Sequence, residues 1–382
     1  MSHDVLTLLP FALVVGLALA VILVDLFVPK RDDIILGLGL GGLVVALVVT
    51  LFIGPMPWDV GALTEATSFG DPALFTRDML TALLDLVLIS IAILTLLFAP
   101  DYLTPRRLPL PEFTATLLFA VSGGMLIAGG QDLLILFIGL ELLVLPGYLL
   151  AGFAKRDGLS TEGAIKYFLL GSFSSAILLF GLAFVMGFTG DTQLAGIAAE
   201  LEGVMSGDEA LPLALAMGLA LLAVGVLFKI AAVPFHYWTP DAYQGSPTPV
   251  TGYLSVGPKI AAFALILRIF VEALGPLRGE WALIIGVLAG LTMTVGNLAA
   301  LGQDNIKRML AYSSIAHTGY MMVGLVVFAT AEDPDVAAAG VQAVLFYAVA
   351  YAFMNLGAFA VVAALQRRPG ITSQISTFTG LG

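Results

Sequence analysis

Residues 229–259 read KIAAVPFHYWTPDAYQGSPTPVTGYLSVGPK, a proline-rich stretch that is the most informative in the chain about its fold. It begins and ends on a lysine, Lys229 and Lys259, inside an otherwise apolar and aromatic region. A proline inside a helix removes a backbone hydrogen bond and clashes with the preceding turn. The crowding of prolines therefore predicts a broken helix that resumes through Tyr243, with a charge beside the break. The prolines are Pro234, Pro240, Pro247, Pro249 and Pro258.

The composition around this stretch is that of a membrane protein. Apolar residues make up 59% of the 382 residues and charged residues only 11%, whereas soluble domains carry about 25% charged residues. The mean hydropathy is +1.03. With no cysteine, the chain itself cannot form disulfides, thiolate metal sites or Fe–S ligation. The histidines leave little room for a metal site, and the sequence contains no phosphate-binding loop. The histidines are His3, His236 and His317.

Apolar segments of about 20 residues, the length that crosses a bilayer as a helix, recur about eleven times. They predict an all-α polytopic membrane protein. The period-2 alternation of apolar and polar residues that is typical of a membrane β-barrel does not occur in the sequence. The first segment lacks a basic start and is long enough to span, so no cleavable signal is predicted. The glycines of GLGLGG at 37–42 are interpreted as helix-packing positions. The segments are 5–28, 34–54, 79–99, 112–129, 131–152, 162–188, 211–235, 248–273, 281–301, 305–330 and 336–365.

The connections between these segments alternate in charge. Odd-numbered connections carry pairs of basic residues, except the seventh, which has none, while even-numbered ones carry only Arg77 and Arg278 as basic residues. The positive-inside rule therefore places the odd connections in the cytoplasm and the N-terminus outside. The basic pairs are Lys30/Arg31, Arg106/Arg107, Lys155/Arg156, Lys307/Arg308 and Arg367/Arg368; the acidic residues of the even connections are Asp59, Glu65, Asp71, Asp191, Glu200, Glu202, Asp208, Glu209, Glu332, Asp333 and Asp335.

Four ionisable residues lie deep in apolar segments: Glu141, Lys229, Lys259 and His317. A charge at the bilayer centre costs about 2.5–3.5 kcal/mol on insertion scales, so such residues are usually functional. A carboxylate about 4 Å from a buried lysine returns about 4 kcal/mol. Moving Glu141 toward or away from Lys229 would thus change the proton affinity of the lysine, and Lys259 could take the proton onward. The alternatives are a static ion pair between helices, and a Lys229 that snorkels to the interface from a simple proline-rich loop.

Other charged residues have less distinct roles. His317 suits a proton relay, or a structural hydrogen bond to Ser313 one turn away. Lys166 is paired at i,i+4 with Glu162, as Arg268 is with Glu272, but Lys166 could lie on a proton route from the cytoplasm. Asp132 is expected to cap the fifth segment, and no role is assigned to Asp85.

Four stretches carry a family resemblance. They closely resemble the antiporter-like subunits of respiratory complex I. Their amino-acid sequences are most similar to those of the N subunits of the bacterial proton-translocating NADH:quinone oxidoreductase (NDH-1). The resemblance covers roughly residues 70–382. The stretches are ELLVLPGYLLAGF from Glu141, TEGAIKYFLLGSFSSAILLFG from Thr161, FKIAAVPFHYWTPDAYQGSPTPVTGYLSVGPKIAAF from Phe228, and NIKRMLAYSSIAHTGYMM from Asn305.

The resemblance implies a fold of two inverted five-helix repeats, each with one broken helix. It divides the chain into an N-terminal three-helix segment (1–111), a first repeat (112–275) broken near 234–243, and an incomplete second repeat (276–382) that lacks its C-terminal part. By the family's pattern, Glu141 and Lys229 gate the proton and Lys259 passes it on. The chain itself would bind no cofactor.

The resemblance also implies the surroundings of the chain. FMN, Fe–S clusters and quinone are expected in partner subunits, and neighbouring antiporter-like subunits of the complex are expected beside the chain in a bacterial inner membrane. The rival interpretations are a subunit of a multisubunit cation/proton antiporter, a sister antiporter-like subunit of the same complex, and a structural membrane scaffold whose buried charges only hold helices together.

Overall fold

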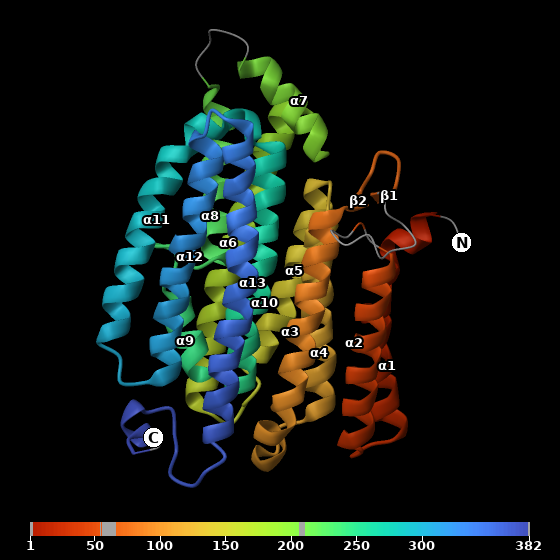
Figure 1. The fold of residues 1–382 in the computed structure, drawn as a ribbon, viewed down its shortest axis with the longest axis vertical. Helices are drawn as coiled ribbons and strands as arrows, with labels where there is room; N and C mark the ends of the chain where they lie inside the picture. Colours follow the sequence, from red (N-terminus) through yellow and green to blue (C-terminus); the bar gives the residue numbers. More distant parts are fainter. Residues whose placement is uncertain (1–2, 54, 56–65, 206–210, 381–382) are drawn as a thin grey trace.

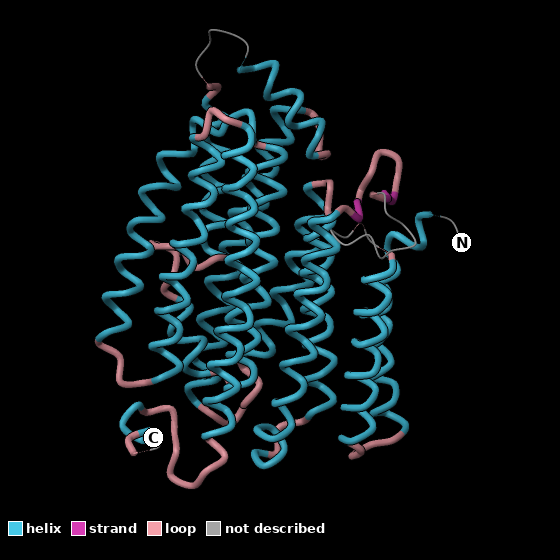
Figure 2. Tube along the Cα trace, in the orientation of Figure 1, coloured by secondary structure: helices cyan, strands magenta, loops and turns pink. Residues whose placement is uncertain are grey.

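A computed structural model describes residues 3–53, 55, 66–205 and 211–380 of the chain. The described part is almost entirely helical (Figure 2). Ten of its helices are long and apolar enough to cross a membrane, and each corresponds to one predicted segment. These helices are α1 (His3–Phe27), α2 (Asp32–Phe52), α3 (Met79–Leu103), α4 (Leu110–Gly129), α5 (Leu133–Ala151), α6 (Gly158–Thr189), α10 (Thr248–Ile266), α11 (Arg278–Leu301), α12 (Ile306–Thr330) and α13 (Pro334–Leu365).

The remaining predicted segment is the broken one. It consists of α8 (Leu213–Lys229) and α9 (Trp238–Gly245), separated by residues 230–237. The break therefore begins four residues before Pro234. Ala231 adopts a left-handed conformation with φ 58°, and the amides of Ala231 and Ala232 donate to the carbonyls of Phe228 and Leu227. This is the Schellman pattern that ends a helix, formed here with alanine at the position where glycine is usual.

The helices run alternately up and down, so the connections gather at two ends of the bundle (Figure 1). The basic end, at the bottom of the figure, holds the α1–α2, α3–α4, α5–α6 and α11–α12 connections and the segment after α13. The α9–α10 connection also lies at the basic end, beside Lys307, and the acidic end holds the α2–α3, α4–α5, α6–α8, α10–α11 and α12–α13 connections. The predicted charge alternation thus corresponds to two physical ends. Asp59, Glu65, Asp208 and Glu209 lie outside the described residues, as do the side chains of residues 1–4.

Two elements at the acidic end are absent from the sequence prediction. One is a small antiparallel hairpin, β1 (Thr67–Phe69) and β2 (Phe75–Arg77), in which Phe69 pairs with Phe75. The other is helix α7 (Leu194–Met205), which buries Leu194, Ile197 and Leu201 on one face. Three short 3₁₀ helices and one π-helix complete the described chain. The 3₁₀ helices are η1 (Thr104–Arg106), η3 (Gly275–Leu277) and η4 (Ile375–Phe378), and the π-helix is η2 (Leu267–Ala273), which continues α10.

Helix α10 forms the centre of the bundle, because every residue from Thr248 to Ile266 is buried. It packs against α3, α4, α5, α8, α9, α12 and α13, while α1 and α2 pack on the side of α3 and α4. The predicted packing role of the glycines at 37–42 holds for Gly39 and Gly42, which lie against Thr114 and Leu17. It is wrong for Gly37 and Gly41, since a side-chain carbon there would meet open space.

Candidate functional site

Lys229 is the last residue of α8 and lies at the break, with only 9% of its surface exposed. Its ammonium donates to the Ser175 hydroxyl at 2.8 Å and lies 3.5 Å from the Gly171 carbonyl, both on α6. The C-terminal end of a helix carries partial negative charge and favours a cation. Because α8 stops halfway through the bundle (Figure 1), this favourable site for a cation lies in the interior.

Glu141 lies on α5 and does not contact Lys229. Among the described residues Lys229 forms no ion pair within 4 Å, so the two members of the predicted separable pair stand apart in this structure. One carboxylate oxygen of Glu141 is buried with no hydrogen-bond partner, and so is the hydroxyl of Tyr148 on the same helix. The Tyr148 hydroxyl sits against Gly171, whose carbonyl faces Lys229. Glu141 and Tyr148 thus each hold a buried polar atom without a hydrogen-bond partner, and Tyr148 and Lys229 both lie against Gly171.

Lys259 lies in the middle of α10 and is also held without a carboxylate. Its ammonium donates to the Ser314 carbonyl at 2.6 Å, the Ser314 hydroxyl at 2.6 Å and the Thr318 hydroxyl at 2.8 Å. These three acceptors on α12 match the three N–H donors of a charged lysine. The Thr318 hydroxyl in turn donates to the carbonyl of Ile230 at 2.9 Å, which connects the site of Lys259 to the break beside Lys229.

Hydrogen bonds continue from Lys259 toward α13. The Tyr351 hydroxyl lies 2.7 Å from the Ser314 hydroxyl, and the Asn355 amide donates to Tyr351 at 3.0 Å and to the Ser255 hydroxyl at 2.7 Å. His317 follows one turn after Ser314 on α12, and its Nδ1 lies 2.6 Å from the Tyr347 hydroxyl. The hydrogen-bond partner of His317 is therefore Tyr347, and the expected bond to Ser313 is wrong.

Lys166 lies at the basic end rather than beside Lys229. It forms the predicted pair with Glu162 at 2.6 Å and a second pair with Asp241 of α9 at 2.7 Å. Asp241 also binds Arg308 of α12 at 2.5 Å. Ser175 lies nine positions after Lys166 on α6, which corresponds to about 13 Å along the helix. Through these two ion pairs, Asp241 holds α9, the second half of the broken segment, against α6 and α12.

A cavity of about 1030 Å³ opens at the same basic end. Lys307 lies in its lining, is 5% exposed, and donates to the Ser246 carbonyl at 2.6 Å. Five cations and two carboxylates line the cavity: Arg106, Arg107, Lys155, Arg156, Lys307, Glu112 and Asp157.

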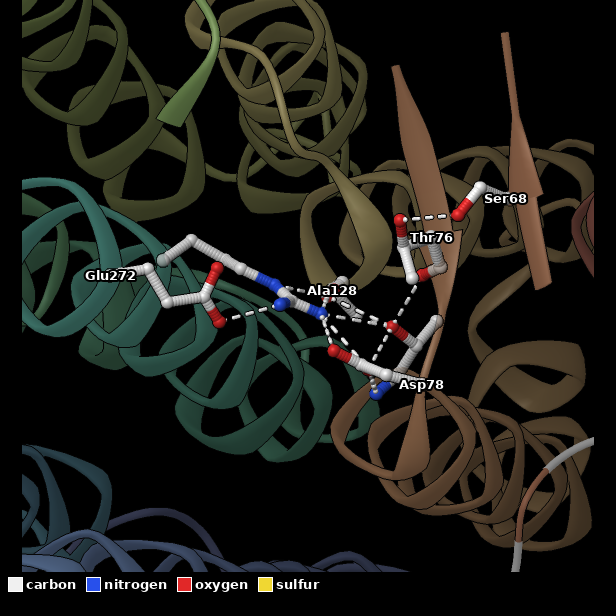
Figure 3. Close-up of polar contacts among 7 residues, drawn as sticks. Ser68, Thr76, Asp78, Ala128 and Glu272 are labelled. Carbon is white, nitrogen blue, oxygen red and sulfur yellow. Dashed lines mark hydrogen bonds and ion pairs between the residues drawn. The ribbon is translucent and has the colours of Figure 1, made fainter. Parts of the chain in front are cut away.

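The charges at the acidic end are arranged differently. The guanidinium of Arg268 donates to Glu272, to Asp78 and to the Ala128 carbonyl, and Figure 3 shows Glu272 on the opposite side from Asp78 and Ala128. Its ion pairs are 2.6 Å to Glu272, as the sequence predicts, and 2.9 Å to Asp78. Asp85, to which no role is assigned from the sequence, pairs with Arg77 at 2.9 Å, and both side chains are 1% exposed.

Asp132 caps α5 as predicted, because its carboxylate accepts from the Leu134 amide. The partners that sequence reasoning missed are Ser175, Ser314, Thr318, Tyr351 and Asp241. The sequence carries no signal for the hydroxyl residues, since serine and threonine are common in apolar helices. Within the described residues, no group of three or more histidine, aspartate or glutamate side chains could hold a metal ion.

Comparisons with known proteins agree with this architecture. Residues 130–382 match the family model described as NADH:quinone oxidoreductase/Mrp antiporter, TM. The chain is 42% identical over 381 residues to an NADH-quinone oxidoreductase subunit N 1 of Koribacter versatilis, covering 99% of this chain and 73% of the relative. It is 41% identical over 381 residues to an NAD(P)H-quinone oxidoreductase subunit 2 of a Synechocystis species, covering 98% of this chain and 68% of the relative.

Solved structures are similar as well. A chain of respiratory complex I from Thermus thermophilus superposes with a TM-score of 0.72 and 33% identity, covering 93% of this chain and 70% of that one. A chain of the Mrp complex from a Dietzia species shares the fold, with a TM-score of 0.71, 22% identity, and coverage of 95% and 66%. The chain therefore belongs to the NADH:quinone oxidoreductase/Mrp antiporter family of membrane proteins.

Proposed function

We propose that the chain is the antiporter-like N subunit of a proton-translocating NADH:quinone oxidoreductase, and that Lys229 and Lys259 carry the proton through it. The observation that carries this proposal is that both lysines are buried and form no ion pair among the described residues, and that the Thr318 hydroxyl connects Lys259 to the carbonyl of Ile230, the residue next to Lys229 at the helix break. Broken helices with charges at the break are typical of ion sites in transporters.

The contrast with Arg268 argues against a scaffold. Buried charges that only hold helices together are expected to be paired, because an unpaired buried charge is strongly destabilising. Arg268 has two carboxylate partners and two bonds to the Ala128 carbonyl. Among the described residues, Lys229 and Lys259 form hydrogen bonds only to neutral groups, and a lysine held this way can give up its proton without leaving a directly bonded anion behind.

The remaining polar groups fit a route through the bundle. Lys166 lies at the basic end, on the side of the proposed cytoplasmic entry. Glu141 and Tyr148 present unpaired polar atoms near Lys229, so a shift of Glu141 toward the lysine would stabilise the ammonium and a shift away would release its proton. Beyond Lys259, His317 and Tyr347 extend the polar groups toward α13.

The proposal includes the surroundings of the chain. The subunit takes part in translocation without redox chemistry of its own, while partner subunits hold FMN, Fe–S clusters and quinone. It lies in a bacterial inner membrane with the basic end in the cytoplasm and the N-terminus outside, beside other antiporter-like subunits. Its first five-helix repeat comprises α4, α5, α6, the broken α8–α9 and α10, and α11 begins the second.

Glu141→Gln tests the proposal in membrane vesicles that carry the assembled complex. We expect NADH oxidation to drive fewer protons per electron than in the parent complex, because the amide cannot change the charge facing Lys229. Glu202→Gln, on the exposed side of α7, is the matched control and should pump normally. Normal pumping by assembled Glu141→Gln would favour the scaffold. Co-purification with FMN and Fe–S subunits is expected, and their absence would favour the antiporter complex instead.

A further inference from the structure

The carbonyl of Ile230 has lost its helical partner for a reason that is visible in the sequence. In a continuous helix it would accept a hydrogen bond from the amide of residue 234, but that residue is Pro234, which has no N–H. Ile230 is 0% exposed, so water does not replace the missing donor at the surface. The Thr318 hydroxyl of α12 supplies the donor at 2.9 Å.

The same hydroxyl also accepts a hydrogen bond from Lys259 at 2.8 Å. A threonine hydroxyl has one proton to donate and lone pairs to accept. With a charged Lys259, the ammonium occupies one lone pair of the Thr318 hydroxyl, and the hydroxyl proton points to the Ile230 carbonyl at 2.9 Å, the nearer of its two acceptors, rather than to the Ser314 carbonyl at 3.2 Å. A neutral Lys259 has two N–H groups and a lone pair, so it needs a donor, and Thr318 cannot donate to Lys259 and Ile230 at once.

We propose that Thr318 is a positioning residue that links the charge on Lys259 to the geometry of the broken helix. Charged Lys259 leaves Thr318 bonded to Ile230 and holds the break closed. Loss of the proton draws the Thr318 hydroxyl toward the Lys259 nitrogen, leaves the Ile230 carbonyl unpaired, and loosens the break beside Lys229. This inference rests on the proposed role of Lys259 in proton transfer. It adds the contact through which the protonation state of Lys259 affects the backbone beside Lys229.

Other groups around Lys259 do not make this link. Ser314 could also donate to a neutral lysine, but its hydrogen bonds run to Lys259, Thr318 and Tyr351, so it does not connect Lys259 to residues 230–237. Two titratable groups face Lys259, namely Tyr351 of α13, whose ring centre lies 5.5 Å from the ammonium, and His317 of α12, and their hydrogen bonds run to Ser255, Ser314 and Tyr347 rather than to residues 230–237. Tyr243 of α9, Lys229 of α8, Asp85 of α3 and Asp78 at the start of α3 have other partners, and Glu141 of α5 and Glu112 of α4 form no ion pair among the described residues.

Thr318→Val removes the hydroxyl and keeps the shape, and Thr318→Ser restores the hydroxyl. The matched control is Thr292→Val. Thr292 accepts from the Val233 amide at 3.0 Å, so it touches the break without any contact to Lys259. All variants are compared in the assembled complex.

The first readout is the pH profile of NADH-driven pumping. Hydrogen bonds from a charged donor are about twice as strong as neutral ones, so Thr318→Val removes more support from charged than from neutral Lys259. We expect the alkaline limb of the profile to move down by about one pH unit. Thr318→Ser should restore the parent profile, and Thr292→Val should leave its pH dependence in place.

The second readout is amide hydrogen exchange of residues 230–237, corrected for the intrinsic pH dependence of exchange. In the parent complex this segment should exchange faster once Lys259 loses its proton. Thr318→Val should exchange fast at every pH, whereas Thr292→Val should be faster overall but keep the pH dependence. An unchanged pH profile and unchanged exchange in Thr318→Val would overturn the inference.

Lys259→Ala separates this inference from the proposed function. If Lys259→Ala assembles and pumps normally, the lysine carries no proton and both proposals fail. If Lys259→Ala abolishes pumping while Thr318→Val behaves like the parent complex in both readouts, only the role of Thr318 fails.

Discussion

Buried charges in this chain are held in two distinct ways. Arg77 and Asp85 are each 1% exposed and form a direct ion pair at 2.9 Å. Lys229 and Lys259 are held by hydroxyl and carbonyl groups alone. The direct ion pair stabilises both charges where they are, whereas the neutral partners of the two lysines allow the ammonium group to lose its proton. We therefore assign a structural role to Arg77 and Asp85, and a role in proton transfer to Lys229 and Lys259.

Asp85→Asn should therefore destabilise the protein strongly. Arg77 would remain charged in an apolar interior without its partner, and breaking a buried pair costs about 3–5 kcal/mol. We expect a lower melting temperature of the purified complex with little change in the protons pumped per electron by molecules that assemble. The double variant Arg77→Met, Asp85→Leu should recover most of the loss. A single variant as stable as the parent would show that the pair does not contribute.

At this scale the sequence identifies the charges but not their partners. Glu141, Lys229 and Lys259 are found because a charge in a long apolar segment has a clear cost. Ser175 and Thr318 are not found, because their roles depend on which faces of distant helices meet. For the same reason the sequence does not give the distance between Glu141 and Lys229, which form no ion pair with each other in this structure.

Close helix contact positions the partner of Lys229. A side-chain carbon on Gly181 of α6 would lie 2.7 Å from the backbone nitrogen of Leu222 on α8. Only a glycine allows the two backbones to approach this closely, and the approach brings Ser175 within hydrogen-bond distance of Lys229.

Gly181→Ala should push α8 away from α6. We expect lower thermal stability and lower pumping per electron, because the contact between Ser175 and Lys229 lengthens. Gly187→Ala on the same helix is the control, since a side-chain carbon there meets nothing within 4 Å. Equal behaviour of the two variants in melting and pumping assays would contradict this account.

The elements themselves follow from segment length and apolar composition, so all eleven predicted segments have counterparts. The break is predicted by the prolines, but its start at Ile230 is not, because an alanine, Ala231, takes the left-handed position. Helix α7 and the β1–β2 hairpin are missed because three buried residues in α7 and three-residue strands give too weak a pattern.

The whole molecule has a basic end and an acidic end, and the positive-inside rule assigns the basic end to the cytoplasm. The absence of cysteine makes this directly testable. Arg156→Cys lies in the exposed α5–α6 connection and Glu202→Cys on the exposed side of α7. In intact cells, a membrane-impermeant thiol reagent should label Glu202→Cys and spare Arg156→Cys. The reverse pattern would invert the topology.

The central claim is that buried lysines at a helix break carry protons through this chain. NADH-driven proton pumping by Lys229→Ala, in vesicles and normalised to the amount of assembled complex, tests it most directly. We predict that pumping is lost or sharply reduced while the complex remains assembled. Full pumping by a verified, assembled Lys229→Ala complex would contradict the claim and leave Lys229 as a structural residue.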